Sequence, residues 1–203
     1  MASEQPNLVL ASNSPRRRDL LRRAGYRLDV RPPPVSEQGV KADRPAGPYV
    51  ESLAYLKATA AIEAHGLADG LVLGADTAVE LGGRLLGKPA DEADARRILS
   101  ELSGTRHRVV TGLALVDIGA GRRLLAHDIT RIRMAVMTPE EIEAYVAGGE
   151  ALGKAGAYAI QETGDRYVEE VDGSFTNVVG LPMELLERML KAAGYDPKVF
   201  RDA

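Results

Sequence analysis

Apolar residues recur with two different spacings in the first part of the chain. Short, continuous apolar runs at 8–11 and 71–75 predict buried strands. Between them, residues 49–65 carry apolar side chains every three or four positions, which predicts a helix that ends at Gly66. The proline-rich segment 29–48 cannot form a long helix and predicts an extended loop or a short strand.

Strand-like and helix-like patterns continue to the end of the chain. Two glycines at 82–83 predict a hairpin turn. The further elements that we expect are helices over 91–102, 140–147 and 183–193, and strands over 109–116, 129–136, 157–160 and 167–171. Because strands and helices alternate early while hairpins occur in the middle, the pattern predicts an α/β fold with a mixed sheet.

Composition narrows the class of protein. The length of 203 residues and the hydrophobic fraction of 45% fit one globular domain. The net charge of −3 argues against a partner such as nucleic acid or a membrane surface. The chain has no cysteine, which excludes disulfides, thiol nucleophiles and zinc-thiolate sites. It shows neither a signal peptide nor an apolar run of membrane-spanning length, so we expect a cytoplasmic protein.

The first predicted helix begins against the usual electrostatic rule. Ser14 suits the N-cap and Pro15 the first helical position, but Arg16 to Arg18 follow where acids are favoured, at a cost of roughly a few tenths of a kcal/mol each. The helix that starts at Thr138 obeys the rule, with Glu141 in a capping box. A bound polyanion at the first helix would compensate for the repulsion, and a solvated basic face is the alternative.

Two further charged residues interrupt apolar patterns. Lys57 falls in the middle of the apolar stripe that runs from Val50 to Ala61, so it either pairs with an anion or extends along the edge of the core to water. Asp76 follows a predicted buried strand, where a carboxylate could bind a divalent metal, accept a proton from water, or cap a turn. Thr77 beside it could bind a ligand or simply belong to the strand.

Several familiar motifs are absent. The segment Gly82 to Lys88 resembles a P-loop, but Pro89 replaces the required hydroxyl residue and the segment predicts a hairpin, so Lys88 is either a phosphate contact or a solvated turn residue. The histidines form no zinc pattern, and no glycine-rich dinucleotide motif joins a strand to a helix. Arginines, lysines and carboxylates remain, which suit phosphoryl chemistry with a hard metal ion.

Taken together, five segments in order resemble the Maf family of nucleoside triphosphate pyrophosphatases over nearly the whole chain. They are Leu10–Arg17, Leu73–Thr77, Gly87–Pro89, Ser103–His107 and Val179–Pro182. The resemblance implies a single domain over 1–203 of the Maf/ITPase-like type, in which a mixed, curved sheet flanked by helices forms two lobes around a nucleotide cleft. It also implies hydrolysis of a nucleoside triphosphate to the monophosphate and pyrophosphate with a divalent cation, Mg²⁺ or Mn²⁺, and a possible homodimer.

The resemblance also assigns roles to individual residues. Asp76 would activate water and, with Glu37, lie at the metal. Arg17, Thr77 and Gln161 fall where the family sets its base preference. The residues that would surround the triphosphate are Ser12, Arg16, Arg17, Lys57 and Lys88.

The segment 153–161 resembles the subgroup that acts on dTTP and UTP. A related subgroup that acts on 7-methyl-GTP is one alternative. A nucleotide-binding regulator of cell division with little turnover is another, and a scaffold whose basic helix docks an acidic partner is a third.

Overall fold

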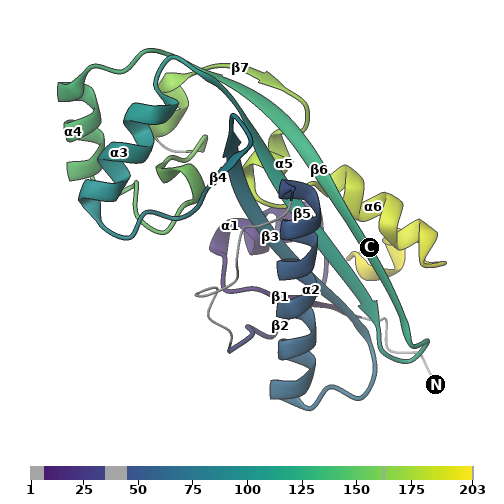
Figure 1. Ribbon diagram of the computed structural model, residues 1–203. Helices are drawn as coiled ribbons and strands as arrows, with labels where there is room; N and C mark the ends of the chain where they lie inside the picture. Colours follow the sequence, from purple (N-terminus) through teal and green to yellow (C-terminus); the bar gives the residue numbers. More distant parts are fainter. Residues whose placement is uncertain (1–6, 35–44, 162, 203) are drawn as a thin grey trace. The chain divides into compact units, whose positions relative to one another are not determined.

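The fold is built on one mixed β-sheet. The computed structural model describes residues 7–34, 45–161 and 163–202, and within them the sheet has seven strands in the order β2-β1-β3-β5-β6-β7, with β4 paired to β3 (Figure 1). The strands are β1 (Leu8–Ala11), β2 (Leu28–Val30), β3 (Leu71–Leu81), β4 (Arg84–Leu86), β5 (Arg106–Asp117), β6 (Arg122–Met134) and β7 (Val168–Asp172). β1 runs parallel to β2 and β3, whereas β4 is antiparallel to β3 and β7 to β6. The predicted mixed α/β fold is confirmed.

Helices flank this sheet, and the described residues fall into two compact units. The α-helices are α1 (Pro15–Arg23), α2 (Ala46–His65), α3 (Glu92–Leu102), α4 (Pro139–Ala147), α5 (Phe175–Val179) and α6 (Met183–Ala192), with short 3₁₀ helices at Ala155–Ala157, Thr163–Tyr167 and Pro197–Phe200. The first unit is drawn from Met1–Asp76, Thr111–Asp128 and Gly180–Ala203, and the second from Thr77–Val110 and Ile129–Val179. None of the helices in these described parts combines the length and apolarity that a membrane crossing needs.

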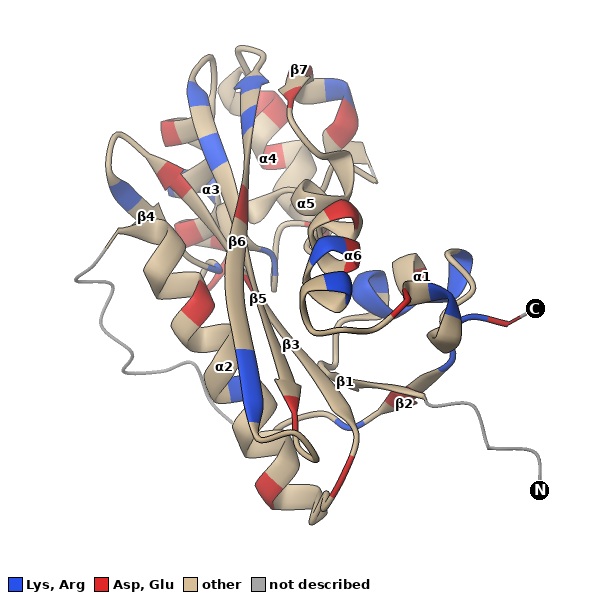
Figure 2. Ribbon diagram, turned by 90° about the vertical axis from the view of Figure 1, so that its right-hand side faces the viewer, with Lys and Arg blue, Asp and Glu red and all other residues tan. Residues whose placement is uncertain are grey.

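In the first unit, helices cover both faces of the sheet. Leu8 and Leu10 of β1 belong to a hydrophobic cluster with residues of α1 and α6. Val9 and Ala11, which point to the opposite face because strand side chains alternate, belong to a cluster with α2. Figures 1 and 2 show α2 along one face and α6 on the other. The alternation in β1 therefore decides which helix each side chain contacts.

Two glycines let α2 lie unusually close to the sheet. A Cβ added to Gly74 of β3 would lie 2.0 Å from the backbone oxygen of Ala54, and one added to Gly112 of β5 would lie 2.4 Å from the backbone carbon of Val50. Neither distance is possible for a real side chain, so both strands need glycine where the helix crosses them. Small side chains such as Ala58 complete this contact.

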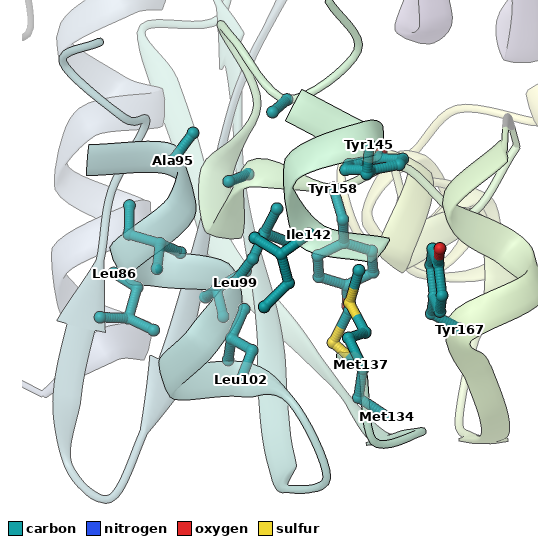
Figure 3. Close-up of a cluster of buried hydrophobic side chains, with 14 of the residues drawn as sticks. Leu86, Ala95, Leu99, Leu102, Met134, Met137, Ile142, Tyr145, Tyr158 and Tyr167 are labelled. Atoms are coloured by element: carbon teal, nitrogen blue, oxygen red, sulfur yellow. The ribbon is translucent and has the colours of Figure 1, made fainter. Parts of the chain in front are cut away.

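The second unit has its own hydrophobic core between the sheet and α3 and α4 (Figure 3). Leu99 and Leu102 come from α3, Ile142 from α4 and Met134 from β6. Three tyrosines, Tyr145, Tyr158 and Tyr167, extend this cluster, and the rings of Tyr145 and Tyr167 pack edge to face at 6.1 Å. Phenol rings supply apolar surface together with a hydroxyl that needs a partner, so polar contacts are built into this core.

Several element predictions need correction. The segment predicted as a strand at 157–160 begins in a 3₁₀ turn, because Gly156 and Ala157 have φ angles of +74° and +60°, incompatible with an extended strand. Its apolar character reflects burial. β6 starts at Arg122 rather than at 129, since its first half is half-exposed and gives only a weak apolar signal. α2 starts at Ala46, three residues before its predicted start, and the short helix α5 was not predicted.

We expect Gly74→Ala to lower the free energy of unfolding by about 1–3 kcal/mol or more, because the new methyl group overlaps the α2 backbone. Urea denaturation monitored by circular dichroism measures this change. Gly87→Ala is the matched control, because its φ lies outside the left-handed region and an added Cβ meets nothing within 4 Å. Equal stabilities of the two variants would contradict the proposed helix–strand contact.

Candidate phosphate and carboxylate site

The start of α1 has the cap that the sequence predicts. The Ser14 hydroxyl accepts a hydrogen bond from the Arg17 backbone N–H at 3.4 Å, and Pro15 occupies the first turn. This turn contains no acid, whereas α4 begins with a complete capping box between Thr138 and Glu141. The positive end of the helix dipole and the arginine side chains therefore act together at α1, where Figure 2 colours the arginine positions of the ribbon blue.

Arg17 points inward from this turn. Its Nε donates to the backbone oxygen of Gly180 at 2.8 Å, and its Nη1 donates to the backbone oxygen of Ala75 at 2.9 Å and to the Ser12 hydroxyl at 3.3 Å. The residue is only 9% exposed, so the alternative of a fully solvated basic face is wrong for Arg17. A planar guanidinium can make these diverging bonds at once, and it thereby ties α1 to β3 and to the segment that precedes α6.

Strand register brings Ser12 to the same place. β1 and β3 are parallel, with Ala11 beside Gly74, so Ser12 follows β1 at the level of Ala75. The Ser12 hydroxyl accepts from the Ser14 N–H at 3.2 Å as well as from Arg17. The carboxyl ends of parallel strands are where α/β proteins bind ligands, and this position fits that rule.

Lys57 and Asp76 form a buried ion pair. The Lys57 Nζ lies 2.5 Å from Asp76 Oδ1, and the residues are 8% and 6% exposed. The pairing follows from two periodicities: Val72, Gly74 and Asp76 share the face of β3 that α2 covers, and Lys57 lies on the stripe of α2 that faces it. The ammonium therefore does not extend to water, and Asp76 lies inside β3 rather than in a turn.

The other predicted site residues have different settings. Arg16 is half-buried in the first turn of α1, and Glu37 lies outside the described residues. Thr77, Lys88 and Gln161 belong to the second unit, where Thr77 is half-buried in β3 while Lys88 and Gln161 are exposed. Lys88 follows the β3–β4 hairpin, in which Leu81 pairs with Arg84, so the interpretation as a P-loop is rightly rejected.

The donor set at Asp76 suits a cation that takes most of its ligands from elsewhere. Across the described part of the chain, no group of three or more histidine, cysteine or acidic side chains is arranged to hold a metal ion. Mg²⁺ characteristically binds through one or two carboxylates together with water and substrate phosphate oxygens. A single buried carboxylate such as Asp76 fits that pattern, and it does not fit an all-protein cage.

The structure adds two functional groups that the sequence did not indicate. They are the backbone oxygens of Ala75 and Gly180, which orient the Arg17 guanidinium. Backbone acceptors leave no trace in residue type, so no sequence signal distinguishes them. The only available sign was that both residues lie within segments that resemble the family's motifs.

These features together define an α/β protein in which cationic groups from two helices, Arg17 of α1 and Lys57 of α2, lie beside a carboxylate of β3 past the carboxyl end of a parallel strand, a chemistry suited to phosphates. The chain belongs to the Maf family: the profile described as Maf-like protein matches residues 7–193. Five of its segments resembled that family, and the match confirms the family assignment.

Several bacterial proteins are similar to this chain over nearly its whole length. A dTTP/UTP pyrophosphatase from Pelotomaculum thermopropionicum is 46% identical over 189 residues, which cover 93% of this chain and 97% of the relative. Proteins of the same name from Moorella thermoacetica and Gloeobacter violaceus are 48% and 45% identical, covering 93% and 95% of this chain and 96% and 98% of the relatives.

We expect Lys57→Met to lower the free energy of unfolding by about 3–5 kcal/mol, because the substitution leaves the Asp76 carboxylate buried without its cation. Urea unfolding measures the loss. The double variant Lys57→Met/Asp76→Asn removes both charges and should regain part of it. A single variant as stable as the wild type would show that the pair contributes nothing to folding.

Proposed function

We propose that this protein hydrolyses dTTP and UTP to the monophosphate and pyrophosphate. The buried Lys57–Asp76 pair, next to the inward-facing Arg17, is the observation that carries the proposal. The names of relatives more than 40% identical over nearly their whole length support the same activity. Net negative charge with a local cluster of arginines also fits a small anionic substrate better than a polymer.

The triphosphate binds, in this proposal, to Ser12, Arg16, Arg17, Lys57 and Lys88. The start of α1 supports this assignment, because the helix N-terminus and the arginines concentrate positive charge in a first turn that contains no acid. Arg17 also has a structural role, since its bonds to Ala75 and Gly180 fix the geometry of the turn to which the phosphates bind. Preformed cationic groups stabilise the charge that develops on the departing pyrophosphate.

Asp76 is proposed to accept the proton of the water that attacks the α-phosphorus. A carboxylate must be ionised to accept a proton, and Asp76 forms an ion pair with the Lys57 ammonium. Asp76 and Glu37 would hold the divalent cation, Mg²⁺ or Mn²⁺. When bound, the cation neutralises phosphate charge that would otherwise repel the incoming oxygen.

Base preference is assigned to Arg17, Thr77 and Gln161. The support is the segment 153–161, which resembles the subgroup that acts on dTTP and UTP. The predicted homodimer and cytoplasmic location rest on the resemblance and on composition, and they stay predictions.

We expect Asp76→Asn to reduce pyrophosphate release from dTTP by about 10²- to 10⁴-fold, because an amide cannot act as the general base. Initial rates are measured with Mg²⁺ and with Mn²⁺, and dTTP affinity measured by calorimetry without added metal should stay close to that of the wild type. Asp117→Asn is the matched control, a buried aspartate of β5 that contacts Tyr195 and Arg122, and it should retain turnover. Retained turnover in the Asp76 variant would remove the residue from the base role. Tight dTTP binding by the wild type without pyrophosphate release would favour a nucleotide-binding regulator.

We expect the wild type to hydrolyse dTTP and UTP with kcat/KM at least about tenfold above that for CTP and 7-methyl-GTP, a difference of about 1.4 kcal/mol in transition-state binding. Parallel assays of the four nucleotides at equal metal concentration measure this preference. A preference for 7-methyl-GTP would instead place the chain in the related subgroup.

A further inference from the structure

The loop that leads to Gln161 is held in an unusual backbone conformation. Gly156 and Ala157 have φ angles of +74° and +60°, and Ala157 is the only non-glycine residue with positive φ in the described parts of the chain. A left-handed conformation is unfavourable for alanine and persists only where surrounding contacts impose it. Ala157 is fully buried, so such contacts exist.

One of these contacts joins the loop to the residue before Lys88. The Gly156 N–H donates to the Gly87 backbone oxygen at 3.1 Å. A Cβ on Gly156 would lie 2.7 Å from Val79 Cγ2, so the loop also lies directly on β3. The conformation at Gly156 therefore couples the segment that carries Gln161 to the segment that carries Lys88.

A buried histidine–tyrosine pair forms a second contact. His107 Nε2 and the Tyr158 hydroxyl lie 2.7 Å apart, the two rings pack edge to face at 5.6 Å, and the residues are 2% and 6% exposed. Burial lowers the pKa of His107 to about 4, so the ring is neutral near neutral pH. Its Nδ1 is buried and has no hydrogen-bond partner among the described residues. Two apolar side chains would fill this space without the free-energy cost of burying an unsatisfied Nδ1 atom. This indicates that the hydrogen bond between His107 and Tyr158 serves more than packing.

Three more hydrogen bonds fix the loop, one before Gln161 and two after it. The Ala159 N–H donates to the Tyr145 hydroxyl of α4 at 3.3 Å, and Tyr145 and Tyr158 lie in the same buried cluster (Figure 3). Beyond Gln161, the Thr163 hydroxyl and N–H donate to the Glu150 carboxylate at 2.8 and 3.2 Å. Gln161 is thus an exposed side chain on a loop whose backbone is fastened before and after it.

We propose that His107 and Tyr158 are positioning residues that set nucleotide preference by fixing the loop Lys154–Gln161 against Gly87. This inference rests on the proposed function, in which Gln161 contacts the base and Lys88 the triphosphate. Neither His107 nor Tyr158 needs to touch the nucleotide. They act through Gln161. Without the hydrogen bond between His107 and Tyr158 the loop is held less firmly, and the Gln161 side chain then adopts more orientations.

Tyr158→Phe tests the proposal, because it removes the hydroxyl and keeps the ring. We expect KM for dTTP and UTP to rise about three- to tenfold and the preference over CTP to fall by a similar factor. This is the size of effect that the loss of one hydrogen bond produces. The kcat should stay within about twofold, because Asp76 and Lys57 are untouched. Tyr195→Phe is the matched control: it removes a tyrosine hydroxyl that donates to Asp117 in the first unit, and it should leave KM and preference unchanged.

Melting temperature and dTTP affinity, measured on both variants, separate the possible outcomes. A lower melting temperature in the Tyr158 variant with unchanged KM and preference would overturn the proposal, because the pair would then be only structural. In the double variant His107→Leu/Tyr158→Phe, recovered stability with still-impaired preference supports a positioning role, and full recovery of preference contradicts it. If the wild type releases no pyrophosphate, the proposed function fails, while a weaker dTTP affinity of the Tyr158 variant still tests the positioning role.

Discussion

The buried pair between Lys57 and Asp76 is the interaction on which the rest of the first unit depends. Removing two charges from water is costly, and the cost is offset only when the partners meet at close range. That range requires α2 to lie almost against β3, which in turn requires glycine at 74 and small side chains on the helix. A lysine in an apolar stripe and an aspartate in a buried strand each look anomalous alone. They are the two partners of one ion pair, the lysine from α2 and the aspartate from β3.

Much of this arrangement could be predicted from the sequence, because the relevant signals are local. The cap at Ser14 and Pro15, the left-handed Gly66 at the end of α2 and the β3–β4 hairpin all follow from residue types at fixed positions. The mixed sheet followed from the alternation of short strands and helices. The interruption of an apolar stripe predicted that Lys57 either pairs with an anion or extends along the edge of the core to water, and the ion pair with Asp76 decides between these alternatives.

Other features could not be predicted, because tertiary contacts determine them. Residues 157–160 have an apolar pattern typical of a strand, yet Gly156 is held against Val79 and forces a turn. The direction of the Arg17 side chain depends on two backbone oxygens that no residue type reveals. Resemblance to the family named the residues of the candidate site, but only the register of β1 and β3 explains why Ser12 and Ala75 are neighbours.

The burial of His107 has a consequence for how the protein responds to its surroundings. Histidine ordinarily gains or loses charge in the range of acidity that cells experience, and many proteins use it as a sensor for that reason. With its pKa lowered to about 4, this ring stays uncharged throughout that range, and its hydrogen bond to Tyr158 is unaffected by ordinary changes in acidity. A residue type that often senses protons therefore forms, at this position, a hydrogen bond that does not depend on pH within that range.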